Sequence, residues 1–181
     1  MRRLALALVF VSMVGAMPAA FSESPVDCAI AAISYRLQMP GWDNVAKLCN
    51  GATSTAPVDC AAAAISYRLQ MPGWDNVAEL CQGATSAAPV DCAAAAISYR
   101  LQMPGWDNVA RLCNRATSTA PVDCGAAAIS YRLQMPGWDN VARLCNGARS
   151  SAPVDCAAAA ISYRLQMPGW DNVAALCSTV R

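Results

Sequence analysis

Ten cysteines recur in pairs along this chain, and their spacing is the first feature that could carry chemistry. The chain contains no histidine and no Cys-x-x-Cys motif, so the pattern is unlike that of zinc sites. An even number of cysteines in an exported chain favours disulfides. We therefore expect no metal and no free thiol. The ten residues are Cys28, Cys49, Cys60, Cys81, Cys92, Cys113, Cys124, Cys145, Cys156 and Cys177.

Two pairing schemes respect the period of the sequence. Pairing inside each repeat joins Cys28 to Cys49 and leaves no cysteine over. Pairing across the connector joins Cys49 to Cys60 and leaves Cys28 and Cys177 without partners. We favour the first scheme, in which each disulfide closes a loop of about 22 residues and stabilises the fold by about 3 kcal/mol. A unit this small needs such a crosslink, because its own core is limited.

Tryptophan and arginine also recur once per repeat and are candidate partner-binding residues. An exposed tryptophan row would suit a protein partner or a carbohydrate, whereas buried rings would close the hairpin. An arginine row would attract a polyanion, or would complement a helix dipole and pair with nearby acids. The tryptophans are Trp42, Trp74, Trp106, Trp138 and Trp170. The arginines are Arg36, Arg68, Arg100, Arg132 and Arg164.

Catalytic constellations are missing from the sequence. Without histidine there is no Ser-His-Asp or Cys-His arrangement, and no phosphate-binding or dinucleotide-binding loop occurs. Asp27 and Asp43 recur in every repeat, which argues against one catalytic cleft, and both suit helix starts. We expect a protein that is not an enzyme and that has no cofactor.

Two helices per repeat must position these side chains. The longer is expected from Pro25 to about Gln38, with a Ser24–Asp27 capping box in the first repeat and Ala56 or its equivalent at the cap later. Pro40-Gly41 then makes a turn. The shorter helix is expected to start at Asp43 as N-cap and to stop at Asn50-Gly51.

The apolar residues predict which faces are buried. The longer helix has two apolar stripes, so we expect it to be buried on both sides. The first stripe is Val26, Ile30, Ile33 and Leu37, and the second is Cys28, Ala32, Tyr35 and Met39. On the shorter helix we expect Trp42 and Val45 on the buried face, and Asp43, Asn44 and Lys47 on the solvent face.

The predicted fold class is all-α, with five tandem hairpins of 32 residues that are stapled by disulfides and stacked as a short α-solenoid. The repeats span 25–56, 57–88, 89–120, 121–152 and 153–181, within a domain of residues 23–181. In layout the chain resembles disulfide-stapled helical hairpin repeats such as the secreted Sel1-like proteins, but their Gly- and Tyr-rich consensus is absent. It also lacks the Cys-x-x-x-Cys motif of plant α-hairpinins, so no functional residue is carried over.

Residues 1–22 have the order of a secretory signal peptide, with Arg2 and Arg3 before an apolar run and small residues up to Ser22. The apolar run is too short for a membrane span. Without Arg2 and Arg3 the formal net charge changes from +1 to −1, which gives no overall attraction to nucleic acid. We expect a secreted protein without a membrane span.

The expected function is binding, or a structural spacer role, through a repeated surface. A protein or another extended, repetitive ligand is the expected partner, because identical sites in series gain avidity. The alternative is a precursor that releases each hairpin as an antimicrobial or signalling peptide. Release of such peptides usually needs dibasic cleavage sites in the connectors. The connectors have none, because Arg115 and Arg149 are single basic residues.

Overall fold

The computed structural model describes residues 24–34, 37, 41–66, 69, 73–98, 101, 105–130, 137–162 and 169–180. These residues form ten α-helices and no strand, with one longer and one shorter helix in each repeat. The longer helices are α1 (Pro25–Ser34), α3 (Ala56–Ser66), α5 (Ala88–Ser98), α7 (Ala120–Ser130) and α9 (Ala152–Ser162). The shorter helices are α2 (Trp42–Cys49), α4 (Trp74–Cys81), α6 (Trp106–Cys113), α8 (Trp138–Cys145) and α10 (Trp170–Cys177).

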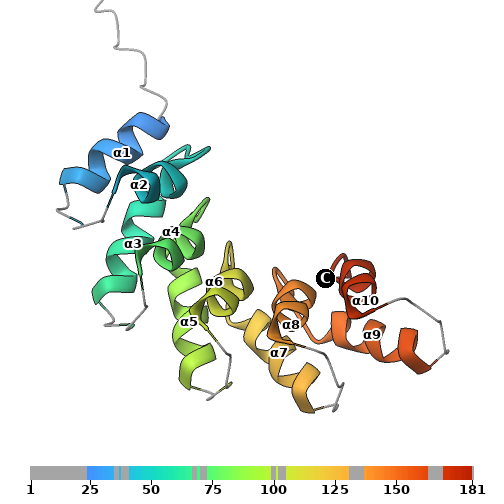
Figure 1. Cartoon of the computed structure of the whole chain (residues 1–181). Helices are drawn as coiled ribbons and strands as arrows, with labels where there is room; N and C mark the ends of the chain where they lie inside the picture. Colours follow the sequence, from blue (N-terminus) through green and yellow to red (C-terminus); the bar gives the residue numbers. More distant parts are fainter. Residues whose placement is uncertain are drawn as a thin grey trace, which may run out of the picture.

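The five hairpins lie side by side in one curved row, from α1 at one end to α10 at the other (Figure 1). Each longer helix packs against the shorter helix of its repeat and against the longer helices of the neighbouring repeats. The shorter helices also pack on one another and run along the inner side of the bend (Figure 1). The predicted all-α solenoid of stacked hairpins is therefore confirmed.

All ten cysteines form disulfides, and each bond joins the two helices of one repeat. The pairs are Cys28–Cys49, Cys60–Cys81, Cys92–Cys113, Cys124–Cys145 and Cys156–Cys177. Their Cα atoms are 5.6–5.7 Å apart, which is an ordinary separation for a disulfide. This confirms the pairing inside repeats and excludes the pairing across the connector. Each bond ties the first turns of the longer helix to the last turn of the shorter one, and we call this the staple end of the hairpin.

The longer helix starts differently in the first repeat and in the later ones. At α1 the predicted capping box is present, because the Ser24 backbone N–H donates to Asp27 Oδ2 at 2.9 Å and the Asp27 N–H donates to Ser24 Oγ at 3.3 Å. In α3 the helix begins at Ala56, so the cap is Thr55, whose carbonyl accepts from the Val58 N–H at 2.8 Å. The prediction that Ala56 and its equivalents would be the caps is wrong by one residue.

The longer helix is also shorter than predicted at its far end. It ends at Ser34 in the first repeat, and Leu37 is not helical, so the expected continuation to Gln38 is wrong. The restriction that Pro40 imposes on the residue before it therefore does not mark the helix end. Residues 35–36 and 38–40 lie outside the described residues.

The shorter helix begins one residue before Asp43, with Trp42 as its first residue and Gly41 as its N-cap. No side chain caps this helix, so the prediction of Asp43 as N-cap is wrong. Gly41 has φ 95° and ψ 146°, a conformation that is essentially restricted to glycine. The backbone turn, rather than a capping carboxylate, therefore sets where the helix starts. Asp43 lies in the first turn, where its charge still favours the positive end of the helix dipole.

The predicted stop at Asn50-Gly51 is confirmed. Gly51 has φ 69°, and the Ala52 N–H donates to the Cys49 carbonyl at 3.0 Å, which closes the helix. Arg115 occupies the equivalent position in the third repeat and adopts φ 57° without being glycine. This left-handed conformation is uncommon for a residue with a side chain.

Several predictions about buried faces are wrong, because neighbouring repeats decide which side chains are covered. Asn44 was expected to face solvent, but it is 7% exposed because the next repeat lies over it. Ile33 and its equivalents were expected to be buried, but they remain 40–51% exposed. Val58, which belongs to the same stripe as Ile65, is fully buried. From the second repeat on, the stripe is thus covered near the staple end and open near the turn. In the first repeat the expected burial is also wrong for Val26 and Ile30, which are 65% and 56% exposed.

Polar contacts also join successive repeats, and sequence reasoning did not find them. Asn114 Nδ2 donates to the carbonyls of Glu79 at 2.5 Å and Gln82 at 3.2 Å, in the last turn and cap of the preceding short helix. Asn146 repeats the arrangement one unit later, with the Arg111 carbonyl at 2.6 Å. These amides satisfy carbonyls that a helix end leaves without intrahelical partners. They help to hold the short helices in register.

The expected signal peptide, residues 1–22, lies outside the described residues. Among the helices described, none combines the length and the apolar character that crossing a membrane requires.

Candidate functional site

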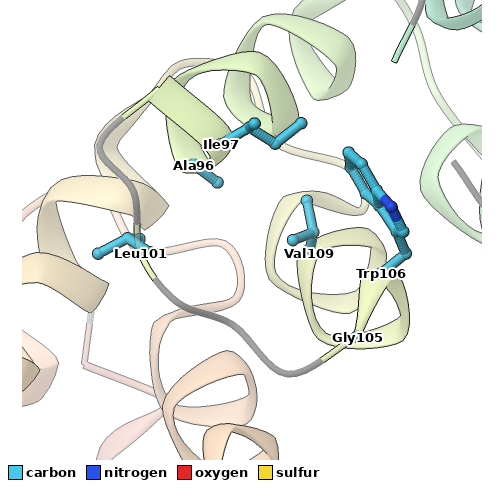
Figure 2. Close-up of a pocket in the computed structure, with 6 residues that line it drawn as sticks. All are labelled: Ala96, Ile97, Leu101, Gly105, Trp106 and Val109. Carbon is cyan, nitrogen blue, oxygen red and sulfur yellow. The ribbon is translucent and has the colours of Figure 1, made fainter. Parts of the chain in front are cut away.

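An open apolar pocket lies at the end of the hairpin opposite the disulfide, where the longer helix ends and the shorter one begins. We call this the turn end. In the third repeat the pocket has a volume of about 250 Å³. The described residues that line it are Ala96, Ile97, Leu101, Gly105, Trp106 and Val109. Figure 2 shows Ile97 on α5 extending toward the indole ring of Trp106 on α6, with Val109 between them and Leu101 on the opposite side.

The first repeat has the same pocket, with a volume of about 230 Å³. Its lining residues occupy the positions equivalent to those in the third repeat: Ala32, Ile33, Leu37, Gly41, Trp42 and Val45. The pocket is therefore a property of the repeated sequence rather than of one place in the fold. The residues that form it are present in all five copies.

Local structure explains why these side chains meet. Gly105, at φ 101°, turns the chain so that Trp106 becomes the first residue of α6. Val109 follows three residues later and therefore lies on the same side of the helix as the indole. Ala96, which is 1% exposed, forms the buried wall, and its small side chain leaves the space between the helices open. The result is a cavity with aliphatic walls and one aromatic edge.

The tryptophans are neither fully buried nor all freely exposed. Trp42 is 68% exposed, whereas the four later tryptophans are partly buried and pack against the core. The prediction that Trp42 lies on a buried face is therefore wrong, because none of the described residues forms a repeat before it. In the later repeats the indole therefore contributes to packing and still presents part of its surface beside the pocket.

The arginine row cannot be placed in the same way. Arg36, Arg68, Arg100, Arg132 and Arg164 lie outside the described residues. Two ion pairs among the described residues involve other positions: Lys47 with Glu79 at 3.3 Å and Arg111 with Asp139 at 3.0 Å. Both pairs join neighbouring repeats on a surface where screening makes each one weak.

None of the described residues that line the pocket has a group that could transfer a proton or act as a nucleophile. The described lining residues carry only apolar side chains or none. Across the described ranges, no three His, Cys, Asp or Glu side chains gather as metal ligands would. Hydrogen bonds from the Ser24 hydroxyl and backbone N–H lower the pKa of the Asp27 carboxyl. This residue caps α1 and lies apart from the pocket lining.

Sequence reasoning identified the tryptophan half of this site and missed the isoleucine half. Ile33 and its equivalents were assigned to a buried stripe, because the helical period alone cannot show how far a neighbouring repeat extends. A usable signal was present in the alanines. The buried positions of the longer helix are mostly Ala, and these small side chains let neighbouring helices approach closely near the staple end. At the turn end the same small side chains leave the space between the two helices unfilled.

Comparison of the chain with protein-family models, with curated proteins and with solved structures gave no match.

Proposed function

We propose that this chain is an exported, non-enzymatic repeat protein that binds an extended or repetitive partner through the row of turn-end pockets. The observation that carries the proposal is the same apolar pocket at equivalent positions of the first and third repeats. The partner we favour is a protein segment with regularly spaced apolar side chains. Each pocket is large enough for one such side chain, and an aromatic edge is typical of binding surfaces.

The spacing of the repeats suggests the conformation of that partner. Helices in contact are about 8–10 Å apart, so successive pockets are separated by about 10 Å along the row. An extended chain advances about 3.3 Å per residue, so every third residue of an extended segment would reach a new pocket. Identical sites in series then gain avidity without any new type of contact.

A pair of labelled peptides tests this proposal. The first peptide carries Leu at every third position between polar residues, and the second has the same composition with the Leu residues grouped at one end. We expect the oxidised protein to bind the first peptide several-fold more tightly, measured by fluorescence anisotropy, because only that peptide fills several pockets at once. Equal affinity for the two peptides would contradict a repeated site.

Variants of the pocket sharpen the same experiment. Ile97→Glu places a charge on one pocket, and replacing all five tryptophans by alanine removes the aromatic edge from each. We expect a partial loss of peptide affinity from the first change and a complete loss from the second. Arg143→Glu is the matched control, because Arg143 is exposed on a short helix and lines neither described pocket. Turnover of a substrate that a change in one repeat abolishes would refute the non-enzymatic role.

Export is supported by two independent features. Residues 1–22 have the composition of a signal peptide, and the five disulfides suit an oxidising compartment. Expression in a secreting host should give a chain that begins near residue 23, as read by intact mass. A chain that stays inside the cell with reduced thiols would contradict secretion.

The alternative function, a precursor of separate hairpin peptides, has one observation in its favour. Each disulfide closes inside its own repeat, so a released hairpin would keep its crosslink. Against it, Leu80 and Val90 are fully buried between repeats and would become exposed on release. Mass analysis of the secreted material distinguishes the two functions: one species near full mature length supports the binding protein, and separate hairpins support the precursor.

A further inference from the structure

We infer that copies of this protein associate head to tail, with the α10 end of one copy docking on the α1 end of the next. The two ends of the row carry the same surfaces that join neighbouring repeats inside the chain. The inference concerns these two end surfaces alone and does not depend on what the pockets bind.

The first of these surfaces is the one that each repeat turns toward the repeat before it. We call it the leading face. In the second repeat it includes Val58, Ala61 and Ala78, and all three are fully buried. In the first repeat the equivalent Val26 is 65% exposed, and Ala46 is also exposed. The residue types are unchanged at these positions, so the first repeat presents an uncovered copy of an established interface.

The second surface is the one that each repeat turns toward the repeat after it, and we call it the trailing face. In the fourth repeat it includes Leu144, which is fully buried, and Asn140, which is 7% exposed. In the fifth repeat the equivalent Leu176 is 50% exposed and Asn172 is exposed. Again the residue types are kept.

Solenoids usually end in repeats with a polar outer face, which keeps them soluble. The first repeat departs from this rule in the apolar direction. It has Ile30 where the later repeats have Ala, and Ile30 is 56% exposed. Val26 and Ile30 lie four residues apart and therefore on one side of α1. The leading face of the first repeat is thus more apolar than the internal surface it copies.

A polar contact is also available at the junction. Inside the chain, Asn114 and Asn146 donate to the carbonyls at the end of the preceding short helix. Asn50 holds the same position in the first repeat and is exposed. In a docked pair it would reach the end of α10 of the preceding copy. Ala175 replaces a charged residue there, so no like charge opposes Lys47 across the junction.

The arrangement excludes closure within one chain and predicts the type of assembly. The two faces lie at opposite ends of the curved row (Figure 1), so each must find its complement on another copy. Contacts between two different faces are heterologous, and they give open chains or closed rings rather than only dimers. We therefore expect a concentration-dependent series of oligomers.

Two charged variants test the inference by sedimentation velocity of the oxidised full-length secreted chain. Val26→Glu blocks the leading face and Leu176→Glu blocks the trailing face, and both positions are half or more exposed, so folding should survive. For each variant alone, the dissociation constant of the oligomers should rise about tenfold or more, because docking would bury an unpaired charge. Ser98→Glu is the control, because it adds a negative charge at an exposed position in the middle of the row that is not among the described pocket residues, and it should leave the oligomers unchanged. Circular dichroism and a thiol count should show that all three variants are folded and oxidised.

Mixing the two variants gives the decisive result. Each retains one intact face, so an equimolar mixture should form dimers and nothing larger, whereas the wild-type chain should also form trimers and beyond. A wild-type chain that stays monomeric up to millimolar concentration would overturn the inference. In that case other residues of the chain or another protein would cover these faces. A wild-type chain that stops at dimers, or a mixture that stays monomeric, would overturn it as well.

Discussion

The two ends of each hairpin have the same neighbours in the row but opposite properties. At the staple end of the third repeat, Cys92, Leu112 and Cys113 are fully buried, and the disulfide fixes the two helices relative to each other. At the turn end, Ile97 is 40% exposed and Trp106 is partly buried beside an open pocket. One end is closed by packing and a covalent bond, and the other remains open.

This contrast indicates how a small unit can both fold and present an apolar surface. A helical hairpin of this size has too little core to be stable by itself. The disulfide and the contacts with neighbouring repeats supply stability at the staple end, so the turn end does not have to close. If this division is correct, changes at the staple end should reduce stability, and changes at the turn end should mainly reduce binding.

The largest effect on stability is expected for Leu112→Ala. Leu112 is fully buried, and truncation of such a side chain costs about 3–4 kcal/mol of unfolding free energy. Ile97→Ala is the turn-end counterpart and should cost about 1 kcal/mol or less, because its side chain is already partly in water. Urea denaturation followed by circular dichroism compares the two. Equal losses would remove the distinction between the ends.

Removal of one disulfide should have a slightly smaller effect. Replacing both Cys92 and Cys113 by alanine should lower the unfolding free energy by about 3 kcal/mol, because the open chain gains entropy in the unfolded state. The neighbouring repeats should keep their disulfides and much of their helix. Hydrogen exchange resolved by repeat is the measurement, and protection lost evenly along the whole chain would contradict a local effect.

A stabilising change is expected at the start of α7. Gly125 is helical, and a methyl group added there would find Val141 Cγ1 at 3.7 Å, an ordinary contact distance. The other repeats have Ala at this position. Gly125→Ala should therefore raise the unfolding free energy by about 1 kcal/mol through helix propensity. Ser130→Ala, an exposed change at the other end of the same helix, is the control for the denaturation experiment. A loss of stability in Gly125→Ala would show that the packing around residue 125 has no room for the added methyl group.

The smallest effect concerns pH and the first helix alone. Hydrogen bonds from Ser24 lower the pKa of Asp27, so the folded state favours the ionised carboxyl. The capping contribution is therefore complete above the usual value of about 3.8 and is lost as the pH falls through the lowered pKa. An NMR titration of the Asp27 carboxyl in wild type and in Ser24→Ala measures it. An unchanged midpoint in Ser24→Ala would contradict this origin of the shift.

The sequence predicts the architecture well because its strongest signals are local or periodic. The cysteine pairs, the glycine after the short helix in three of the five repeats and the period of 32 residues led to the correct hairpin, pairing and solenoid. The Ser24–Asp27 capping box was found for the same reason, since both partners lie within one turn.

The details that were missed depend on contacts between repeats. Asn44 appears on a polar side of its helix, and only the packing of the next repeat shows that it is buried. The amide of Asn114 acts across a separation of more than thirty residues, where a helical period carries no information. The start of α2 was misplaced because Gly41 adopts a conformation that ends one element and begins the next without a capping side chain. The isoleucine half of the pocket was missed for a similar reason, since its exposure depends on where the neighbour stops.

The most direct test of the central claim, that the disulfide of every hairpin closes inside its own repeat, uses the methionine that lies between the two cysteines of each repeat in the sequence. Cyanogen bromide cuts after Met39, Met71, Met103, Met135 and Met167, which separates the two cysteines of each repeat but keeps Cys49 and Cys60 on one fragment. Without reduction, pairing inside repeats predicts that all fragments containing cysteine stay linked in one covalent assembly. Separation into free fragments such as 40–71 before reduction would show that the disulfides span the connectors and would contradict the account.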